Sequence, residues 1–102
     1  MKNTLKDKDS IINTLLLNKA YIQNTFHVKD IALFGSYARG EQTKKSDIDI
    51  LVEFESNHKT FRNYMGLKFY LESLLGLKID LVSKTAIKER LKDSIVKEAL
   101  NV

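Results

Sequence analysis

Hydrophobic residues recur along this chain at two different spacings, which predict alternating helices and strands. Three longer stretches have apolar residues at helical spacing: 9–24, 60–75 and the residues from about 84 onwards. Three shorter stretches are rich in apolar and β-branched residues and are typical of strands: 31–34, 47–54 and 77–82. With a short helix after the first strand, the predicted order is α-β-α-β-α-β-α.

The expected helices have recognisable ends and an inward-facing side. Asp9 or Ser10 is predicted to cap the first helix, and Gly76 is predicted to end the second. In the first helix, Ile12, Leu15, Leu16 and Ile22 are expected to face inward. The residues at helical spacing in the other two helices are Phe61, Tyr64, Leu67, Leu71, Leu74, Leu75, Ile87, Leu91, Ile95 and Ala99. Core packing is the default for the aromatic residues Phe61, Tyr64, Phe69 and Tyr70, but they cover more than one helix face, so some are expected to stay exposed.

The central predicted strand carries acidic side chains on one of its faces. Residues 47–54 alternate over most of their length, and alternate side chains of a strand share a face. One face then carries Asp47, Asp49 and Glu53, and the other Ile48, Ile50, Val52 and Phe54. Leu51 interrupts the acidic row, so we expect another element to cover that end of the face.

Two acids this close together suit a divalent cation. Neighbouring carboxylates raise each other's pKa unless a cation lies between them. Mg²⁺ commonly binds one or two carboxylates together with phosphate oxygens. A solvated edge strand with exposed acids also produces Asp-x-Asp, so this motif alone leaves both interpretations open.

A glycine-serine pair follows the first predicted strand. Gly35 and Ser36 come where the apolar stretch 31–34 gives way to helix-tolerant residues, which predicts a sharp turn into a short helix. Free N–H groups at such a turn bind anions, glycine lets phosphate approach closely, and a serine hydroxyl adds a donor. An ordinary turn with Ser36 as N-cap is the alternative. A P-loop is excluded, because Glu41-Gln42 stand where that motif needs Lys and then Ser or Thr.

Taken together, these motifs resemble the signature of the DNA polymerase β-type nucleotidyltransferase superfamily. The residues that carry the resemblance are Gly35-Ser36, Arg39-Gly40 and Ser46-Asp47-Ile48-Asp49. The small size and the Ala38-Arg39-Gly40 extension narrow it to the minimal nucleotidyltransferases, or MNT proteins. The resemblance covers the chain from the strand before Gly35 to the C-terminus. It implies an α+β nucleotidyltransferase fold, with a small mixed β-sheet flanked by helices.

Members of this family transfer a nucleoside monophosphate from a nucleoside triphosphate to an acceptor hydroxyl, using two metal ions. The resemblance implies that Asp47 and Asp49 bind the metal ions, and Asp80 matches the position of the family's third acid. Asp80 would bind the metal nearer the acceptor and help to deprotonate the acceptor hydroxyl. Taken without the family, Asp80 is better explained as a surface residue of an edge strand.

The resemblance also implies a phosphate site. Gly35 and Ser36 would hold the β- and γ-phosphates, which leave as pyrophosphate. Arg39 is a candidate phosphate ligand, because its guanidinium suits bidentate contacts. The alternative for Arg39 is a surface arginine paired with a neighbouring acid.

Many MNT proteins are encoded beside a helical HEPN protein and act as antitoxins, some by adenylylating a tyrosine of that partner. The resemblance therefore favours a catalytic antitoxin that uses ATP and two Mg²⁺ ions to transfer AMP to a tyrosine hydroxyl of a HEPN toxin. One alternative is an antitoxin that retains the fold and inhibits a HEPN toxin by contact alone. A basic nucleic-acid-binding module is less favoured, because no helix-turn-helix, zinc or RNA-recognition signature is present.

Length and composition fit one compact domain over residues 1–102. Its 43% hydrophobic and 29% charged residues are ordinary for a globular protein, and the net charge is +4. The absence of cysteine excludes disulfides and thiolate metal sites. No apolar stretch has the length of a membrane span or a signal-peptide core, so we expect a cytoplasmic protein. His27 and His58 have no ligand spacing and are expected to be structural or merely exposed.

Overall fold

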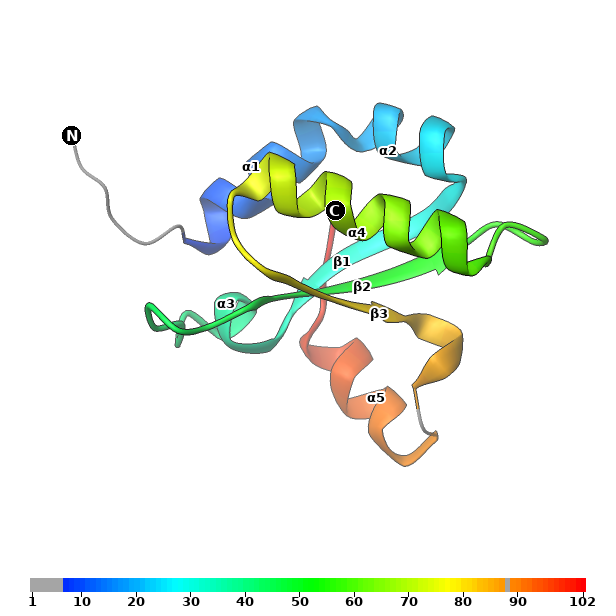
Figure 1. The fold of residues 1–102 in the computed structure, drawn as a ribbon. Helices are drawn as coiled ribbons and strands as arrows, with labels where there is room; N and C mark the ends of the chain where they lie inside the picture. The colour runs from blue at the N-terminus through cyan, green and yellow to red at the C-terminus, as the bar shows by residue number, and fades with distance from the viewer. Residues whose placement is uncertain (1–6, 88) are drawn as a thin grey trace.

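The computed structural model describes residues 7–87 and 89–102, with side chains over 7–87 and 93–102. Its elements, in chain order, are α1 (Lys8–Leu17), α2 (Lys19–Phe26), β1 (Val28–Phe34), α3 (Gly35–Arg39), β2 (Ile48–Phe54), α4 (Phe61–Leu75), β3 (Ile79–Ser83), a 3₁₀ turn η1 (Lys84–Ala86), α5 (Glu89–Glu98) and β4 (Leu100–Asn101) (Figure 1). The predicted α+β class is confirmed. The predicted order differs from the structure in three features: the first helix is divided in two, a short strand follows the last helix, and the helix predicted from about residue 84 begins only at Glu89, after the 3₁₀ turn.

The four strands form one mixed sheet in the order β3-β2-β1-β4. β2 and β3 are parallel, whereas β1 is antiparallel to both β2 and β4. β4 pairs with β1 at Ala32 and Leu33, and its two residues are too few to show any alternation in the sequence. The mixed sheet predicted from the family resemblance is therefore confirmed.

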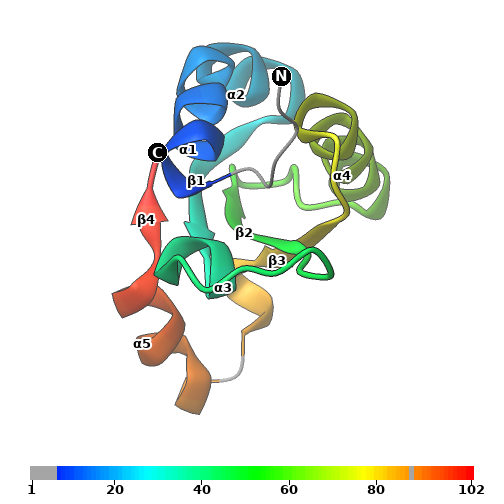
Figure 2. The same cartoon turned by 90° about the vertical axis from the view of Figure 1, so that its left-hand side faces the viewer.

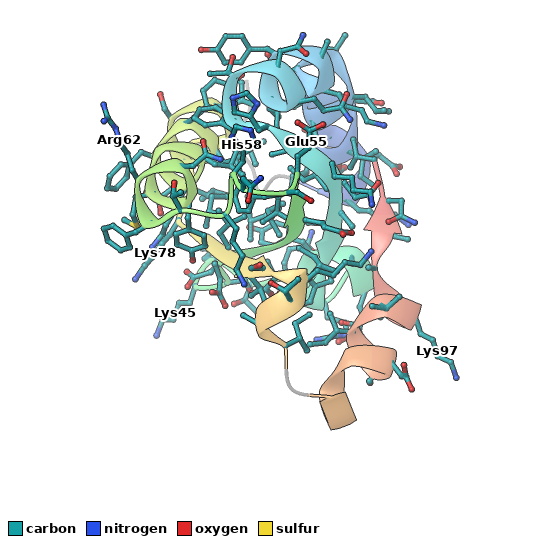
Figure 3. All side chains as sticks on the ribbon, turned by 90° about the vertical axis from the view of Figure 1, so that its right-hand side faces the viewer. Lys45, Glu55, His58, Arg62, Lys78 and Lys97 are labelled. Carbon is teal, nitrogen blue, oxygen red and sulfur yellow. The ribbon has the colours of Figure 1, made fainter. Side chains whose placement is uncertain are left out.

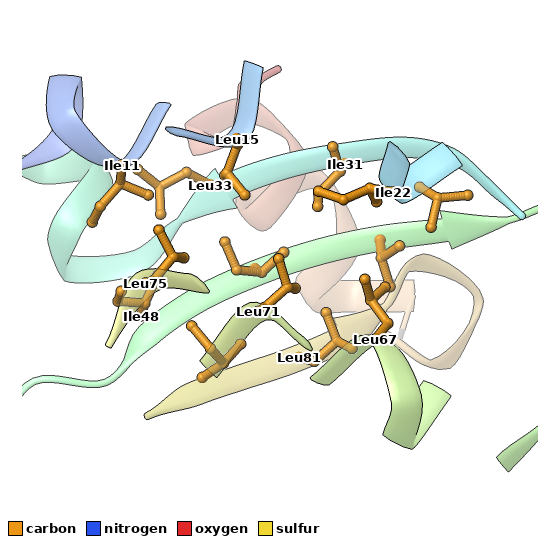
Figure 4. Packing of buried hydrophobic residues seen from close by; sticks show 14 of the residues in the cluster. Ile11, Leu15, Ile22, Ile31, Leu33, Ile48, Leu67, Leu71, Leu75 and Leu81 are labelled. Atoms are coloured by element: carbon orange, nitrogen blue, oxygen red, sulfur yellow. The ribbon is translucent and has the colours of Figure 1, made fainter. Parts of the chain in front are cut away.

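Helices cover the two faces of the sheet unequally. α1, α2 and α4 lie over one face, and α5 lies below the other (Figures 1 and 2). The core fills the space between the three helices and the sheet, and its most deeply buried side chains include Ile11, Leu15, Ile22, Leu33, Ile48, Ile50, Leu67, Leu71, Leu75 and Ile79 (Figure 4). Burial of this apolar surface is the main source of stability for the fold.

Most of the expected core positions are confirmed, but the inward orientation of Leu16 is wrong, because its side chain is 51% exposed. Phe61 and Phe69 are 79% and 61% exposed, which confirms that some of the aromatic residues stay outside the core. Leu91 lies outside the described side chains. Leu51 is only 3% exposed and lines a small cavity with Val96 and Ala99, which confirms that another element covers this end of the acidic face.

The predicted first helix breaks at Asn18. Its backbone N–H donates to the carbonyls of Leu15 and Leu16, and its side-chain Nδ2 donates to Thr14 O at 2.8 Å. Such local bonds compete with helix continuation. The N-cap prediction was also wrong, because Asp7 caps α1 by accepting a hydrogen bond from the Ser10 N–H at 2.8 Å. The described part of the chain contains no helix long and apolar enough to cross a membrane.

Candidate active site

The parallel pairing of β2 and β3 brings two of the predicted acids together. Asp49 and Asp80 are direct partners in the ladder. Their neighbours Ile48 and Ile79 are buried on the side of α1, α2 and α4. Because successive side chains of a strand alternate, both carboxylates project from the opposite face, at the end of the sheet beside α3.

The electrostatic state of Asp49 shows how close these acids are. The pKa of Asp49 is raised to about 6, and burial of the carboxyl is the largest cause. The charge of Asp80, a hydrogen bond to Asp80 and the charge of Asp47 raise this pKa further, whereas the Arg39 guanidinium lowers it. The repulsion disappears when a cation lies between two carboxylates. The pair is therefore suited to bind a divalent metal ion.

Asp47 lies one residue before the start of the strand that was predicted to include it. β2 begins at Ile48, so Asp47 lies just before the strand, and it is exposed. Among the described residues, no three His, Cys, Asp or Glu side chains gather into a ready-made metal cluster. The structure therefore assembles the pair Asp49 and Asp80, with the Asp47 charge nearby. One or two carboxylates are what Mg²⁺ commonly takes from a protein, since water and phosphate complete its octahedron.

Gly35 lies directly against the acid pair. Its φ is +76°, a conformation that favours glycine, and a Cβ atom placed there would lie 2.0 Å from Asp49 Oδ2. The antiparallel pairing of Phe34 with Asp49 sets this contact. The predicted glycine turn thus lies against Asp49, which is paired with Asp80.

The backbone N–H of Gly35 binds an anion in this structure. It donates to Glu98 Oε1 at 3.0 Å, and Arg39 Nη1 donates to the same oxygen at 2.9 Å. Arg39 Nε also donates to Glu41 Oε1 at 2.8 Å, and the two carboxylates raise the pKa of the arginine. Arg39 is therefore paired with two acids, as the alternative interpretation of this residue predicted.

Sequence reasoning missed Glu98. It lies 63 positions after Gly35, and its partners are a backbone N–H and an arginine, so no local pattern indicated it. The alternative interpretation of Ser36 as an N-cap is wrong, because Phe34 holds that position. The exposed lysines Lys45 and Lys78 extend outward near the starts of β2 and β3 (Figure 3).

Comparison with known proteins identifies this architecture. A family model of the nucleotidyltransferase domain matches residues 17–102. The chain belongs to this family. A Methanocaldococcus jannaschii protein with the provisional name protein adenylyltransferase MJ1379 is 51% identical to this nucleotidyltransferase over 84 residues, which cover 81% of this chain and 84% of that protein. The protein adenylyltransferase MntA of Thermococcus cleftensis is 38% identical over 99 residues, which cover 97% of this chain and 96% of that protein.

Solved structures share the fold of this nucleotidyltransferase. One described provisionally as a minimal nucleotidyltransferase matches with a TM-score of 0.83 and 30% identity, covering 98% of this chain and 100% of that chain. A toxin-antitoxin structure with AMP-PNP matches with a TM-score of 0.66 and 28% identity, covering 94% of this chain and 72% of that chain. A structure of a tri-AMPylated Shewanella oneidensis HEPN toxin in complex with MNT antitoxin has a TM-score of 0.56 and 26% identity, covering 92% of this chain and 66% of that chain. The predicted family and fold are confirmed.

Proposed function

We propose that this nucleotidyltransferase is a Mg²⁺-dependent protein adenylyltransferase, which transfers AMP from ATP to a tyrosine hydroxyl of a HEPN toxin and thereby neutralises it. The observation that carries the proposal is the contact of Gly35 with the Asp49 carboxylate, with Asp80 in register beside it. The Gly35 N–H, which can bind an anion, therefore lies next to the acid pair Asp49 and Asp80. The acceptor class is supported by the structural neighbour in which an MNT antitoxin accompanies an AMPylated HEPN toxin.

The acid pair provides the metal-binding end of the site. Asp49 and Asp80 would hold Mg²⁺, and Asp47 would add to the attraction because its charge already acts on Asp49. When bound, a pair of Mg²⁺ ions would neutralise the triphosphate and stabilise the attacking and leaving oxygens. The charges of Asp80 and Asp47, which both act on Asp49, support this assignment.

The glycine turn provides the phosphate-binding end. The Gly35 N–H, the Ser36 hydroxyl and the Arg39 guanidinium would hold the β- and γ-phosphates. At the other end, Asp80 would accept the proton of the acceptor hydroxyl while the acceptor oxygen bonds to the α-phosphorus. The bond between the α-phosphorus and the bridging oxygen breaks, and pyrophosphate leaves. Alignment of the reacting groups supplies much of the rate enhancement in such a site.

The setting of the reaction follows from its substrates. ATP and a partner toxin meet in the cytoplasm, and we place the protein there. The acceptor would approach from the solvent, because Asp80 lies on β3, the end strand of the sheet, and Asp49 lies on the neighbouring strand β2. A partner protein that inserts a tyrosine is better suited to this position than a small molecule that needs an enclosed pocket.

The test uses the protein encoded by the neighbouring reading frame, α-labelled ATP and MgCl₂. Wild-type enzyme should label the partner, and the Asp49→Asn and Asp80→Asn variants should lose about 10²- to 10³-fold in rate, because metal-ion catalysis contributes several kcal/mol. Glu55→Gln is the matched control, because Glu55 (Figure 3) lies just beyond the opposite end of β2 and makes a long, exposed 3.8 Å ion pair with His27. Its transfer rate should stay at the wild-type level.

Two results would contradict the proposal in different ways. Wild-type labelling by folded Asp49→Asn and Asp80→Asn variants would show that the acid pair is not the active site. Full neutralisation of the toxin by variants that no longer transfer AMP would instead favour an antitoxin that acts by contact alone.

A further inference from the structure

Glu98, the last residue of α5, lies in the proposed phosphate site. Its Oε1 accepts hydrogen bonds from the Gly35 N–H at 3.0 Å and from Arg39 Nη1 at 2.9 Å. Both donors are ones that the triphosphate of ATP would use. One carboxylate oxygen of the protein therefore stands where a phosphate oxygen would bind.

We propose that Glu98 sets the nucleotide affinity of this enzyme. Its carboxylate is an internal anion that holds the Gly35 N–H and Arg39 in the nucleotide-free protein and is exchanged for the triphosphate on binding. The inference rests on the proposed function, because it takes the Gly35 turn to be the phosphate site. It adds a residue that the family motifs of this sequence do not contain.

The chemistry of the two ligands supports an exchange. Carboxylate and phosphate oxygens are both anionic acceptors, and both bind backbone N–H groups and guanidinium groups through charge-assisted hydrogen bonds. The Gly35 N–H and Arg39 Nη1 both donate to the same oxygen of Glu98, so that oxygen takes both donors at once, as an oxygen of the triphosphate would.

The position of Glu98 in its helix makes release easy. An acidic residue at the C-terminal end of a helix is opposed by the helix dipole, so α5 itself does not favour the charge. The side chain is 31% exposed, and water can therefore solvate the carboxylate after it leaves. Exchange requires only rotation of one side chain and leaves the backbone of α5 in place.

A purely structural ion pair between α5 and α3 is the competing interpretation. Such a pair would lower the stability of the protein when removed, and nucleotide affinity would stay the same. An internal competitor has the opposite signature: its removal tightens binding, because the apparent Kd is the intrinsic Kd divided by the fraction of sites that are free. The two interpretations therefore differ in a quantity that can be measured.

The decisive variant is Glu98→Gln, titrated calorimetrically with Mg-ATP, with Mg-pyrophosphate and with adenosine. We expect the Kd to fall about two- to fivefold for ATP and for pyrophosphate, the range expected when exposed charged pairs no longer have to be broken. Adenosine has no phosphate and should bind no more tightly than to wild type. Asp93→Asn, which neutralises an exposed acid on the same helix, is the matched control and should leave all three affinities unchanged.

A second variant covers the case in which Glu98→Gln fails to fold. Glu98→Asp keeps the charge but is one methylene shorter, and it should also bind ATP more tightly than wild type. Unchanged or weaker ATP binding by a folded variant would overturn the role of Glu98, as would an equal gain for adenosine or for Asp93→Asn. If wild type transfers AMP in these cases, only this inference fails; if wild type binds no ATP, the proposed function fails with it.

Discussion

Gly35 is the residue on which the geometry of the site depends most directly. Gly35 and Gly76 both have a positive φ, of +76° and +71°. They differ in what surrounds them: a Cβ at Gly35 would meet Asp49 Oδ2 at 2.0 Å, whereas a Cβ at Gly76 would meet nothing within 4 Å. Gly76 is therefore a control for Gly35: both positions favour glycine through their φ, but only at Gly35 would a side chain also collide with Asp49.

We predict that Gly76→Ala costs about 1 kcal/mol of stability, the usual conformational cost of alanine at a positive φ, and retains AMP transfer. Gly35→Ala should cost about 2–4 kcal/mol, because the methyl group must also displace the Asp49 carboxylate, and it should abolish transfer. Urea denaturation and the labelling assay measure the two effects. Equal stability and activity of the two variants would show that Gly35 and Asp49 are not in contact.

Residues of the site differ in how far sequence alone could predict them. Gly35 and Asp49 belong to one local motif whose chemistry is visible in the residue types. Asp80 is one acid in an apolar stretch, and only the family resemblance singled it out; the β2–β3 register then placed it beside Asp49. Glu98 could not be predicted, because its position depends on how α5 packs against the turn.

At the scale of elements, α4 both packs on the sheet and protects its edge. β3 is an end strand of the sheet, and end strands expose unpaired backbone groups that invite association. The Glu72 carboxylate accepts a hydrogen bond from the Ile79 N–H at 3.1 Å, and the Tyr64 hydroxyl donates to the Leu81 carbonyl. Since β3 carries Asp80, these contacts also fix one half of the acid pair.

We predict that Tyr64→Phe lowers the free energy of unfolding by about 1–2 kcal/mol, because the Leu81 carbonyl loses its partner in a partly buried position. Tyr21→Phe is the control, because Tyr21 is 53% exposed, and it should change stability by no more than about 0.5 kcal/mol. Chemical denaturation of both variants measures the difference. If Tyr64→Phe is as stable as Tyr21→Phe, α4 does not protect the edge through this hydroxyl.

At the scale of the whole molecule, the sequence pattern predicted the individual helices and strands better than it predicted how they are arranged. Periodicity found every strand of five residues or more and every long helix, because each buries one apolar face. It could not divide the first helix at Asn18, since side-chain hydrogen bonds leave the hydrophobic pattern unchanged. The mixed sheet came from the family resemblance, and the two-residue β4 is paired only through the tertiary fold.

The acid pair should also make the stability of the whole molecule depend on pH. Without metal, burial and Asp80 raise the pKa of Asp49 from 3.8 to about 6. Between about pH 4 and 6 the unfolded chain releases this proton while the folded protein keeps it, so the free energy of unfolding falls as pH rises through this window. The full shift corresponds to about 3 kcal/mol, and partial exposure of Asp49 reduces the expected loss to about 1–2 kcal/mol. Asp49→Asn should remove this loss in urea titrations with EDTA.

Mg²⁺ should reverse the order of stability of wild type and the Asp49→Asn variant. The ion binds the ionised acids of the folded state, so at neutral pH it should stabilise wild type by about 2.7 kcal/mol at a hundred times its Kd, whereas Asp49→Asn should gain little. The variant should thus be the more stable protein in EDTA and the less stable one in Mg²⁺. Sodium chloride at matched ionic strength controls for screening of surface charges. If Mg²⁺ stabilises wild type and Asp49→Asn equally, the ion binds elsewhere, and Asp49 and Asp80 do not form a metal site.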